Sequence, residues 1–156
     1  MTRTPRPALR LATSLVTGTL AGAMLLIRLV LVPFWRDLPP RDFRVWFGAN
    51  SGRIRALMVP LGTAGAGSSL LTAATETRAG GAVAPAAVAA AASAGVVAIT
   101  LAVNEPANAK FEQLDFDDEQ TGQLLGKWAR WHDVRVILGA VAVTAAAITA
   151  ASSPRR

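Results

Sequence analysis

Four apolar segments dominate this sequence, and each is long enough to cross a lipid bilayer. They comprise residues 9–32, 54–75, 82–105 and 134–151. A helix needs about 20 residues to span a hydrocarbon core about 30 Å thick. Because the backbone in a bilayer must satisfy its own hydrogen bonds, all four segments are predicted to be helices. The expected fold class is all-α: a four-transmembrane-helix bundle forming one membrane-embedded domain over residues 1–156.

Composition and charge favour a protein of the lipid bilayer over other classes. Hydrophobic residues make up 52% of the chain and charged residues 17%, which would leave a soluble domain with too much exposed apolar surface. The formal net charge of +6 does not indicate nucleic-acid binding, because the basic residues lie between the apolar segments. The chain has no cysteine, which excludes disulfides and thiolate metal ligands.

The connections between the segments differ in length. Residues 76–81 form a tight turn, whereas residues 33–53 and 106–133 form long connections that must lie on one side of the membrane. The first long connection contains aromatic residues among arginines, as is typical of a membrane interface: Phe34, Trp35, Phe43, Trp46 and Phe47. The second contains an acidic run, residues 115–119, which is typical of a helix N-terminus. We therefore expect a short interfacial helix in each long connection.

Basic residues at both ends of the chain bear on its orientation. Arg3, Arg6 and Arg10 lie at the start, and Arg155 and Arg156 lie at the end, which favours cytoplasmic termini. The long connections contain more Lys and Arg in total, so the orientation stays open. The basic start also resembles a signal peptide, but its apolar run is longer than a usual signal core, and we expect an uncleaved helix.

Small residues recur at four-residue spacing on three predicted helices. They are Ser14, Gly18 and Gly22; Gly62 and Ala66; and Ala87, Ala91 and Gly95. Such stripes let helix backbones approach closely, which provides van der Waals contact where lipid offers no hydrophobic driving force. They predict a compact bundle, and the sequence leaves open whether that bundle forms a homo-oligomer.

The residues best suited to chemistry lie at the start of the fourth segment. On a helix, Trp128, His132 and Arg135 share one face, and Gly139 continues the stripe one turn further. This stripe predicts room for a flat ligand. An ionisable group beside a transmembrane bundle is costly to keep there, which makes it a functional candidate.

A second polar group lies at the end of the third segment. Asn104 and Asn108 are one helical turn apart, with Pro106 between them. The proline deprives the carbonyl of Ala102 of its usual partner, and we expect an asparagine side chain to supply a replacement.

Each candidate also has a structural explanation. His132 can be a hydrogen-bonding anchor, and Arg135 can extend to lipid headgroups. Trp128 and Trp131 can be interface aromatics, and Asn104 can cap a helix. The helical face that Trp128, His132 and Arg135 share favours a functional site.

No metal is expected, because one histidine, no cysteine and clustered loop carboxylates do not make the ligand sets of zinc, iron or copper. No glycine-rich phosphate loop indicates a nucleotide cofactor.

These residues resemble a known family. The run Asn104-Glu105-Pro106-Ala107-Asn108, followed by Trp128, Trp131, His132 and Arg135, is similar to the anthrone oxygenase-like (DUF1772) family. That family has Asn-x-Pro-x-Asn after its third helix and a Trp, His and Arg cluster opening the fourth. Asn50 occupies a place where the family often has Asn followed by Arg, whereas Ser51 follows here.

The resemblance implies both a reaction and a location. Fungal members are implicated in oxidising anthrones to anthraquinones during polyketide synthesis, without a recognised metal or flavin. It therefore implies an aromatic polyketide-like substrate, dioxygen as oxidant, no cofactor, and a multi-pass protein of the bacterial plasma membrane.

On this interpretation each candidate residue has a role. His132 is the general base, because imidazole titrates near neutral pH. Arg135 and Asn104 stabilise the phenolate-like oxyanion. Trp128 and Trp131 stack on the flat rings, and the substrate-binding set is completed by Asn108 and Asn50. The alternative is a non-catalytic small membrane protein that binds a hydrophobic ligand or a partner helix.

Overall fold

The computed structural model describes residues 6–152, and all of its regular elements are helical. The α-helices are α1 (Arg6–Leu26), α2 (Val32–Asp37), α3 (Pro40–Ala79), α4 (Val83–Ile99), α5 (Glu105–Phe111) and α6 (Asp118–Ala151). Two π-helical turns, η1 (Ile27–Leu31) and η2 (Thr100–Asn104), join α1 to α2 and α4 to α5. Arg3, Arg155 and Arg156, on which the expected orientation rests, lie outside the described residues.

Within residues 6–152, four continuous helical spans are long and apolar enough to cross a membrane. They are Arg6–Asp37, Pro40–Ala79, Val83–Phe111 and Asp118–Ala151. The predicted fold class is therefore confirmed: the protein is an all-α integral membrane protein with four spanning helices.

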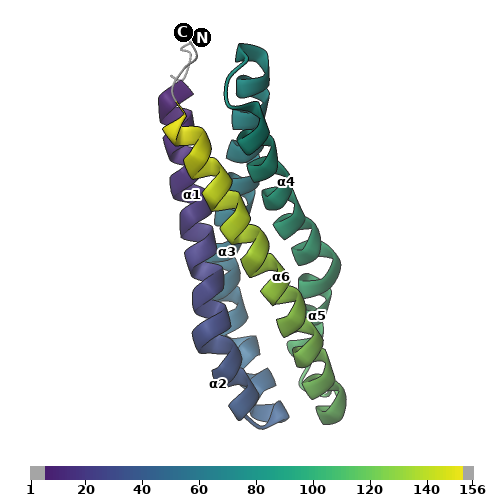
Figure 1. The fold of residues 1–156 in the computed structure, drawn as a ribbon. Coiled ribbons are helices and arrows are strands. Elements are labelled where there is room, and N and C mark those ends of the chain that lie inside the picture. The colour runs from purple at the N-terminus through teal and green to yellow at the C-terminus, as the bar shows by residue number, and fades with distance from the viewer. Residues whose placement is uncertain (1–5, 153–156) are drawn as a thin grey trace.

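The two ends of the bundle differ in the connections they contain (Figure 1). The start of α1, the end of α6 and the α3–α4 turn lie at one end, whereas the α2–α3 and α5–α6 connections lie at the other. A hydrogen bond from Arg10 Nη1 to the carbonyl oxygen of Ser152, 2.7 Å long, ties the start of α1 to the end of α6. Both longer connections of the sequence thus occur at the same end.

This arrangement predicts the outcome of a topology experiment. Reporter fusions placed after Arg78, in the last turn of α3, and after Asp117, which caps α6, should report opposite sides of the membrane. The measurement is the activity of a reporter enzyme that works in only one compartment. Equal activity from both fusions would contradict the four-span arrangement.

The helices extend beyond the apolar segments, so the long connections are shorter than expected. α3 alone runs for 40 residues and α6 for 34. The short helices predicted for the connections do not stand apart. Instead, α2 and α5 continue the first and third spans, and α3 and α6 begin well before their apolar segments. Proline at the first turn suits the start of α3, and the Asp117 carboxylate accepts a 2.8 Å hydrogen bond from the Gln120 N–H at the start of α6.

Aromatic residues expected at the interface are largely buried at this end of the bundle. Trp35 is 2% exposed, Phe43 1% and Phe47 4%, and all three belong to one cluster with Phe111 and Trp128. Ring centroids in this cluster lie 5.0–5.9 Å apart, in tilted or edge-on pairs. The extended helices turn these three rings inward to form a core, which the sequence did not predict. Their depth at the membrane interface stays a prediction.

A buried arginine also joins α3 to α6 at this end. Arg44 is 3% exposed and donates to Thr121 Oγ1 at 2.7 Å and to Asp118 Oδ1 at 2.8 Å. The aromatic cluster and this polar contact together close the end of the bundle that contains the longer connections.

The two π-helical turns have the same relation to proline. η1 ends two residues before Pro33, and η2 ends two residues before Pro106. In each turn a backbone N–H donates a hydrogen bond to the carbonyl five positions earlier. Val32 N–H donates to Ile27 O, and Glu105 N–H donates to Thr100 O. A proline ring clashes with the carbonyl four residues earlier in a regular helix, and the wider π turn makes room for it. The helix thus continues past Pro106 through a π turn. The sequence pattern instead predicted that an asparagine side chain replaces the hydrogen bond that the proline removes.

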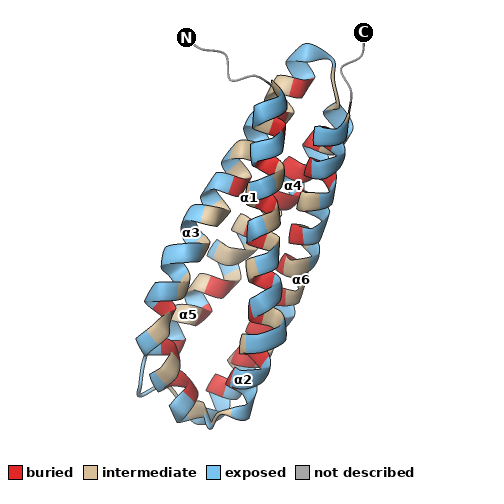
Figure 2. Ribbon diagram, turned by 90° about the vertical axis from the view of Figure 1, so that its left-hand side faces the viewer, coloured by how far each residue is buried: buried red, intermediate tan, exposed pale blue. Residues whose placement is uncertain are grey.

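The predicted small-residue stripes lie at contacts between helices only in part. A Cβ added at Gly18 or Gly95 would meet Val143 Cγ2 at 3.4 Å or Leu138 Cδ1 at 3.1 Å, but none added at Gly22 or Gly62 would meet an atom within 4 Å. Each long helix has its buried residues on the inner face, toward the other helices, and its exposed residues on the outer face (Figure 2). Hydroxyl pairs also link the helices across those inner faces: Thr13 with Thr72 at 2.8 Å, and Ser69 with Ser93 at 3.2 Å.

Candidate functional site

A predominantly apolar pocket of about 150 Å³ lies within the bundle, near the middle of its length. One wall comes from α3 and the opposite wall from α4, η2 and α5, while α6 contributes its polar side chains. Apolar lining residues include Ile54, Met58, Val96, Val97 and Leu101. Polar groups converge on it from three helices: Ser51, Arg55, Glu105, Asn108, His132 and Arg135. An apolar cavity with a few convergent polar groups is the usual form of a small-molecule site.

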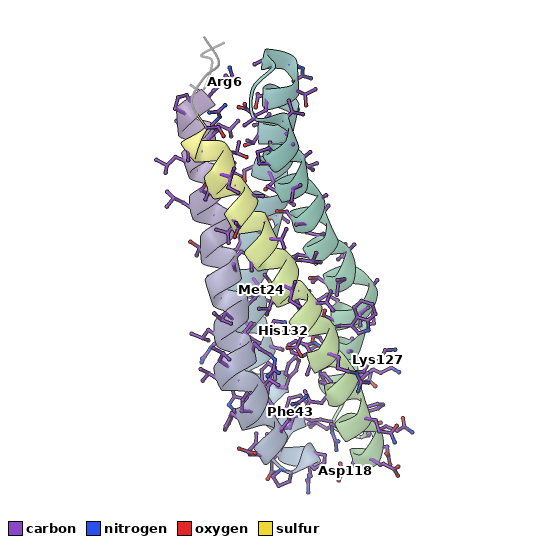
Figure 3. The ribbon with its side chains drawn as sticks, viewed as in Figure 1. Arg6, Met24, Phe43, Asp118, Lys127 and His132 are labelled. Atoms are coloured by element: carbon purple, nitrogen blue, oxygen red, sulfur yellow. The ribbon has the colours of Figure 1, made fainter. Side chains whose placement is uncertain are left out.

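His132 is fully buried at the centre of this arrangement. It has no exposed surface, and its ring stacks on that of Trp128 with centroids 4.9 Å apart and an interplanar angle of 16°. Nε2 lies 2.9 Å from the carbonyl oxygen of Met24 on α1. Figure 3 shows His132 beside Met24, with Phe43 nearer to the end that contains Asp118. The imidazole is thus held by α1 on one side and by Trp128 on another.

These contacts assign a role to each ring nitrogen. A carbonyl oxygen only accepts hydrogen bonds, so Nε2 must carry the proton in the neutral ring. Nδ1 is buried and has no hydrogen-bond partner among residues 6–152. The lone pair of Nδ1 is therefore the basic position of the neutral ring.

Arg135 brings a positive charge to the same pocket without a paired carboxylate. The residue is 7% exposed, and no hydrogen bond or ion pair within the described chain reaches its guanidinium. Its Nε is buried and has no hydrogen-bond partner among residues 6–152, which is costly for a charged group. The pocket therefore contains N–H groups that can donate hydrogen bonds to an oxyanion of a ligand.

Asn108 and Trp128 are joined by a chain of hydrogen bonds that reaches the edge of the pocket. Trp128 Nε1 donates to Asn108 Oδ1 at 2.9 Å, and Asn108 Nδ2 donates to Glu105 Oε1 at 2.9 Å. Glu105 Oε2 in turn lies 3.4 Å from Arg55 Nε on α3. This chain fixes the orientation of the indole on which His132 stacks.

Four of the seven residues singled out in the sequence line the pocket together. They are His132, Arg135, Trp128 and Asn108. Asn104 is 1% exposed but is not among the lining residues, and neither its amide nitrogen nor its oxygen has a partner in residues 6–152. It does not supply the replacement hydrogen bond expected near Pro106.

The other two residues lie outside the pocket. Trp131 is 39% exposed, because it is one residue away from His132 and therefore about 100° around the helix. Asn50 donates a 2.8 Å hydrogen bond to the carbonyl of Trp46 in its own helix. Ser51 lines the pocket where Asn50 was expected.

Sequence reasoning did not identify three polar residues of this site. Ser51, Arg55 and Glu105 all line the pocket. Two signals were present: Arg55 lies inside the second apolar segment, where a charge is costly, and Glu105 lies three residues before Asn108 on a helix.

Gly139 does not provide space for a ligand, although it continues the stripe of His132 and Arg135. A Cβ at this position would collide with Met24 Cε and would meet Ala21 Cβ at 3.5 Å. The missing side chain lets α1 approach α6, and this approach brings the Met24 carbonyl to His132.

Comparison with known proteins identifies a family. The family model for anthrone oxygenase matches residues 43–145, about two thirds of the chain, and this range contains the polar residues of the pocket. No curated protein and no solved structure matches the chain. Among residues 6–152, no three histidine, cysteine, aspartate or glutamate side chains come together as a metal site would require.

Proposed function

This chain belongs to the anthrone oxygenase family, and from that membership we propose that it oxidises an anthrone-like polycyclic phenol with dioxygen, without a cofactor. The bacterial plasma membrane is the location that we propose for this reaction. One observation carries the proposal: the apolar pocket contains the buried imidazole of His132 and the guanidinium of Arg135, and within residues 6–152 neither Nδ1 of the imidazole nor the guanidinium has a hydrogen-bond partner.

The first step is removal of a proton by His132. The methylene of an anthrone lies between two aryl rings and opposite a ketone, so its proton is acidic for a C–H bond. Nδ1 takes this proton while Nε2–H stays bonded to the carbonyl of Met24, which stabilises the imidazolium that forms. The product is an electron-rich anion whose charge lies mainly on the former ketone oxygen.

Arg135 stabilises that oxygen as its charge develops. Arg135 lines the pocket and is 7% exposed, so its charge is in place before the reaction and little reorganisation accompanies it. Trp128 supplies a flat indole face next to the imidazole, and the apolar lining residues surround the hydrocarbon rings.

Dioxygen completes the reaction with a balanced exchange of atoms and electrons. The anion passes one electron to dioxygen, and the resulting radical pair combines at the former methylene carbon. The peroxide takes the proton back from the imidazolium to give a hydroperoxide. Loss of the remaining C–H proton then breaks the O–O bond, which leaves a carbonyl on carbon and releases water. The substrate is oxidised, one oxygen atom enters it, and the other becomes water.

An isotope experiment tests this reaction in the purified protein. In detergent under isotopically heavy dioxygen, an anthrone such as emodin anthrone should yield a quinone with one heavy oxygen atom, faster than in a sample containing detergent alone. Mass spectrometry of the quinone measures the label, and an oxygen electrode measures the rate. A quinone labelled from water, or a rate equal to that in detergent alone, would contradict the proposal.

A further inference from the structure

The pocket reaches the surface of the bundle through apolar residues in the middle of the helices. Val59 on α3 is 51% exposed and Leu101 on η2 is 65% exposed, yet both line the pocket, as does the exposed Thr63. We call the opening bounded by Val59, Thr63 and Leu101 the lateral opening. It connects the cavity beside His132 with the outer face of the protein between α3 and η2.

The lateral opening lies at a depth where the protein faces lipid. Val59 and Thr63 are near the midpoint of the Pro40–Ala79 span, and Leu101 is well inside the Val83–Phe111 span. Leu57, at the same depth on another face of α3, is 56% exposed, as expected for a side chain in contact with acyl chains. A hydrocarbon-soluble molecule therefore reaches this opening without crossing water.

Polar contacts between α3 and the residues from Glu105 to Glu112 bound the pocket toward the nearer end of the bundle. Arg55 pairs with Glu105 at 3.4 Å and with Glu112 at 3.3 Å, and Ser51 Oγ donates to Glu112 Oε1 at 2.8 Å. The buried aromatic cluster around Phe43 and Phe111 lies beyond them and fills the interior of this end. A ligand entering from water on this side would have to break these contacts.

We propose that the ligand of this protein enters its pocket sideways from the lipid phase, through the lateral opening. As a route for substrate the inference rests on the proposed function, whereas as a route for an apolar ligand it rests on the cavity alone. The ligand class that fits is a flat, membrane-soluble polycycle with an acidic hydroxyl. Its rings match the apolar walls of the opening, and its oxygen finds donors at Arg135 once inside.

Binding kinetics in vesicles test the route separately from catalysis. The full-length protein is reconstituted in phosphatidylcholine vesicles and mixed with emodin, an anthraquinone. Quenching of tryptophan fluorescence, to which the pocket residues Trp35 and Trp128 contribute, reports association and dissociation. Val59→Phe narrows the opening and should slow association and dissociation by the same factor, about three- to tenfold, with Kd unchanged, because a barrier acts on both directions equally.

Two controls identify the route. Val45→Phe makes the same change on α3 at a valine that is 53% exposed and does not line the pocket, and both rates should stay at the wild-type values. Glu112→Ala loosens the α3–α5 contacts and should also leave association unchanged. Faster association in Glu112→Ala would overturn the proposal in favour of entry from water. Unchanged rates in Val59→Phe, or a weaker Kd with unchanged association, would overturn it as well.

The outcome for the route is distinct from the outcome for the reaction. If wild-type protein binds emodin with the predicted kinetics but oxidises no anthrone, the lateral route stands and the proposed function fails. If the protein oxidises an anthrone and Val59→Phe changes neither binding rate, the proposed function stands and the lateral route fails.

Discussion

Replacement of His132 by alanine or glutamine should lower the protein-dependent rate of anthrone oxidation by about 10²–10⁴-fold, the usual contribution of a general base. Both changes remove the Nδ1 lone pair that has no partner within the described chain. Glutamine keeps an N–H that can donate to the Met24 carbonyl, so it separates loss of the base from loss of the contact with α1. The measurement is oxygen uptake at equal protein and detergent, after subtraction of spontaneous oxidation.

The control for this prediction is Arg130→Ala. Arg130 is an exposed basic residue on α6, two positions before His132, and it does not line the pocket. Its variant should oxidise the substrate at the wild-type rate. If the glutamine variant remains folded, binds emodin and also keeps the wild-type rate, His132 does not act as the general base of the reaction. The non-catalytic ligand-binding alternative would then be favoured.

Replacement of Glu76 by leucine should destabilise the bundle by about 3–5 kcal/mol, because it leaves a buried arginine without its partner. Glu76 has no exposed surface, and its carboxylate accepts hydrogen bonds from Arg10 Nε at 2.8 Å, Arg10 Nη2 at 2.5 Å and Arg6 Nη2 at 3.0 Å. The Ala82 N–H adds a fourth at 2.9 Å. The measurement is the free energy of unfolding in mixed detergent, followed by circular dichroism.

A double-mutant cycle separates the ion pair from simple packing. Arg10→Met combined with Glu76→Leu removes both charges and should restore much of the stability lost in Glu76→Leu, since apolar replacements of a buried pair are often tolerated. Arg78→Ala, at an exposed arginine in the last turn of α3, should stay within about 0.5 kcal/mol of wild type. The cycle is completed by Arg10→Met alone, and losses in the two single variants that add up to the loss in the double variant would show that Arg10 and Glu76 are not coupled.

The contacts of Glu76 depend both on the local sequence of the turn after α3 and on the packing of α1 beside α3. The chain turns after α3 because Gly80 adopts a left-handed φ of 61°, which favours glycine, and Gly81 N–H bonds back to the Glu76 carbonyl at 3.0 Å. This turn was predictable from the sequence. That the Glu76 side chain accepts hydrogen bonds from two arginines about 70 residues away was not, because it depends on α1 packing beside α3.

The candidate site also has a part that the sequence predicts and a part that depends on tertiary packing. The shared face of Trp128, His132 and Arg135 follows from helical spacing, and all three line the pocket. The same spacing places Trp131 about 100° away from His132, on the exposed side of the helix. Helical spacing alone did not reveal that Asn50 bonds within its own helix, or that Arg55 and Glu105 complete the polar set. These outcomes depend on how each helix is rotated toward its neighbours.

The sequence by itself determined the four spanning helices, the tight turn between the second and third, and the cap that begins the last one. It could do so because a bilayer permits few backbone arrangements and because turns and caps are set by neighbouring residues. Only the tertiary structure decided which aromatic rings form the buried core and which nitrogen of His132 is free. Both follow from contacts between residues far apart in the chain: Met24 reaches His132 across 108 positions, and no local pattern specifies that approach.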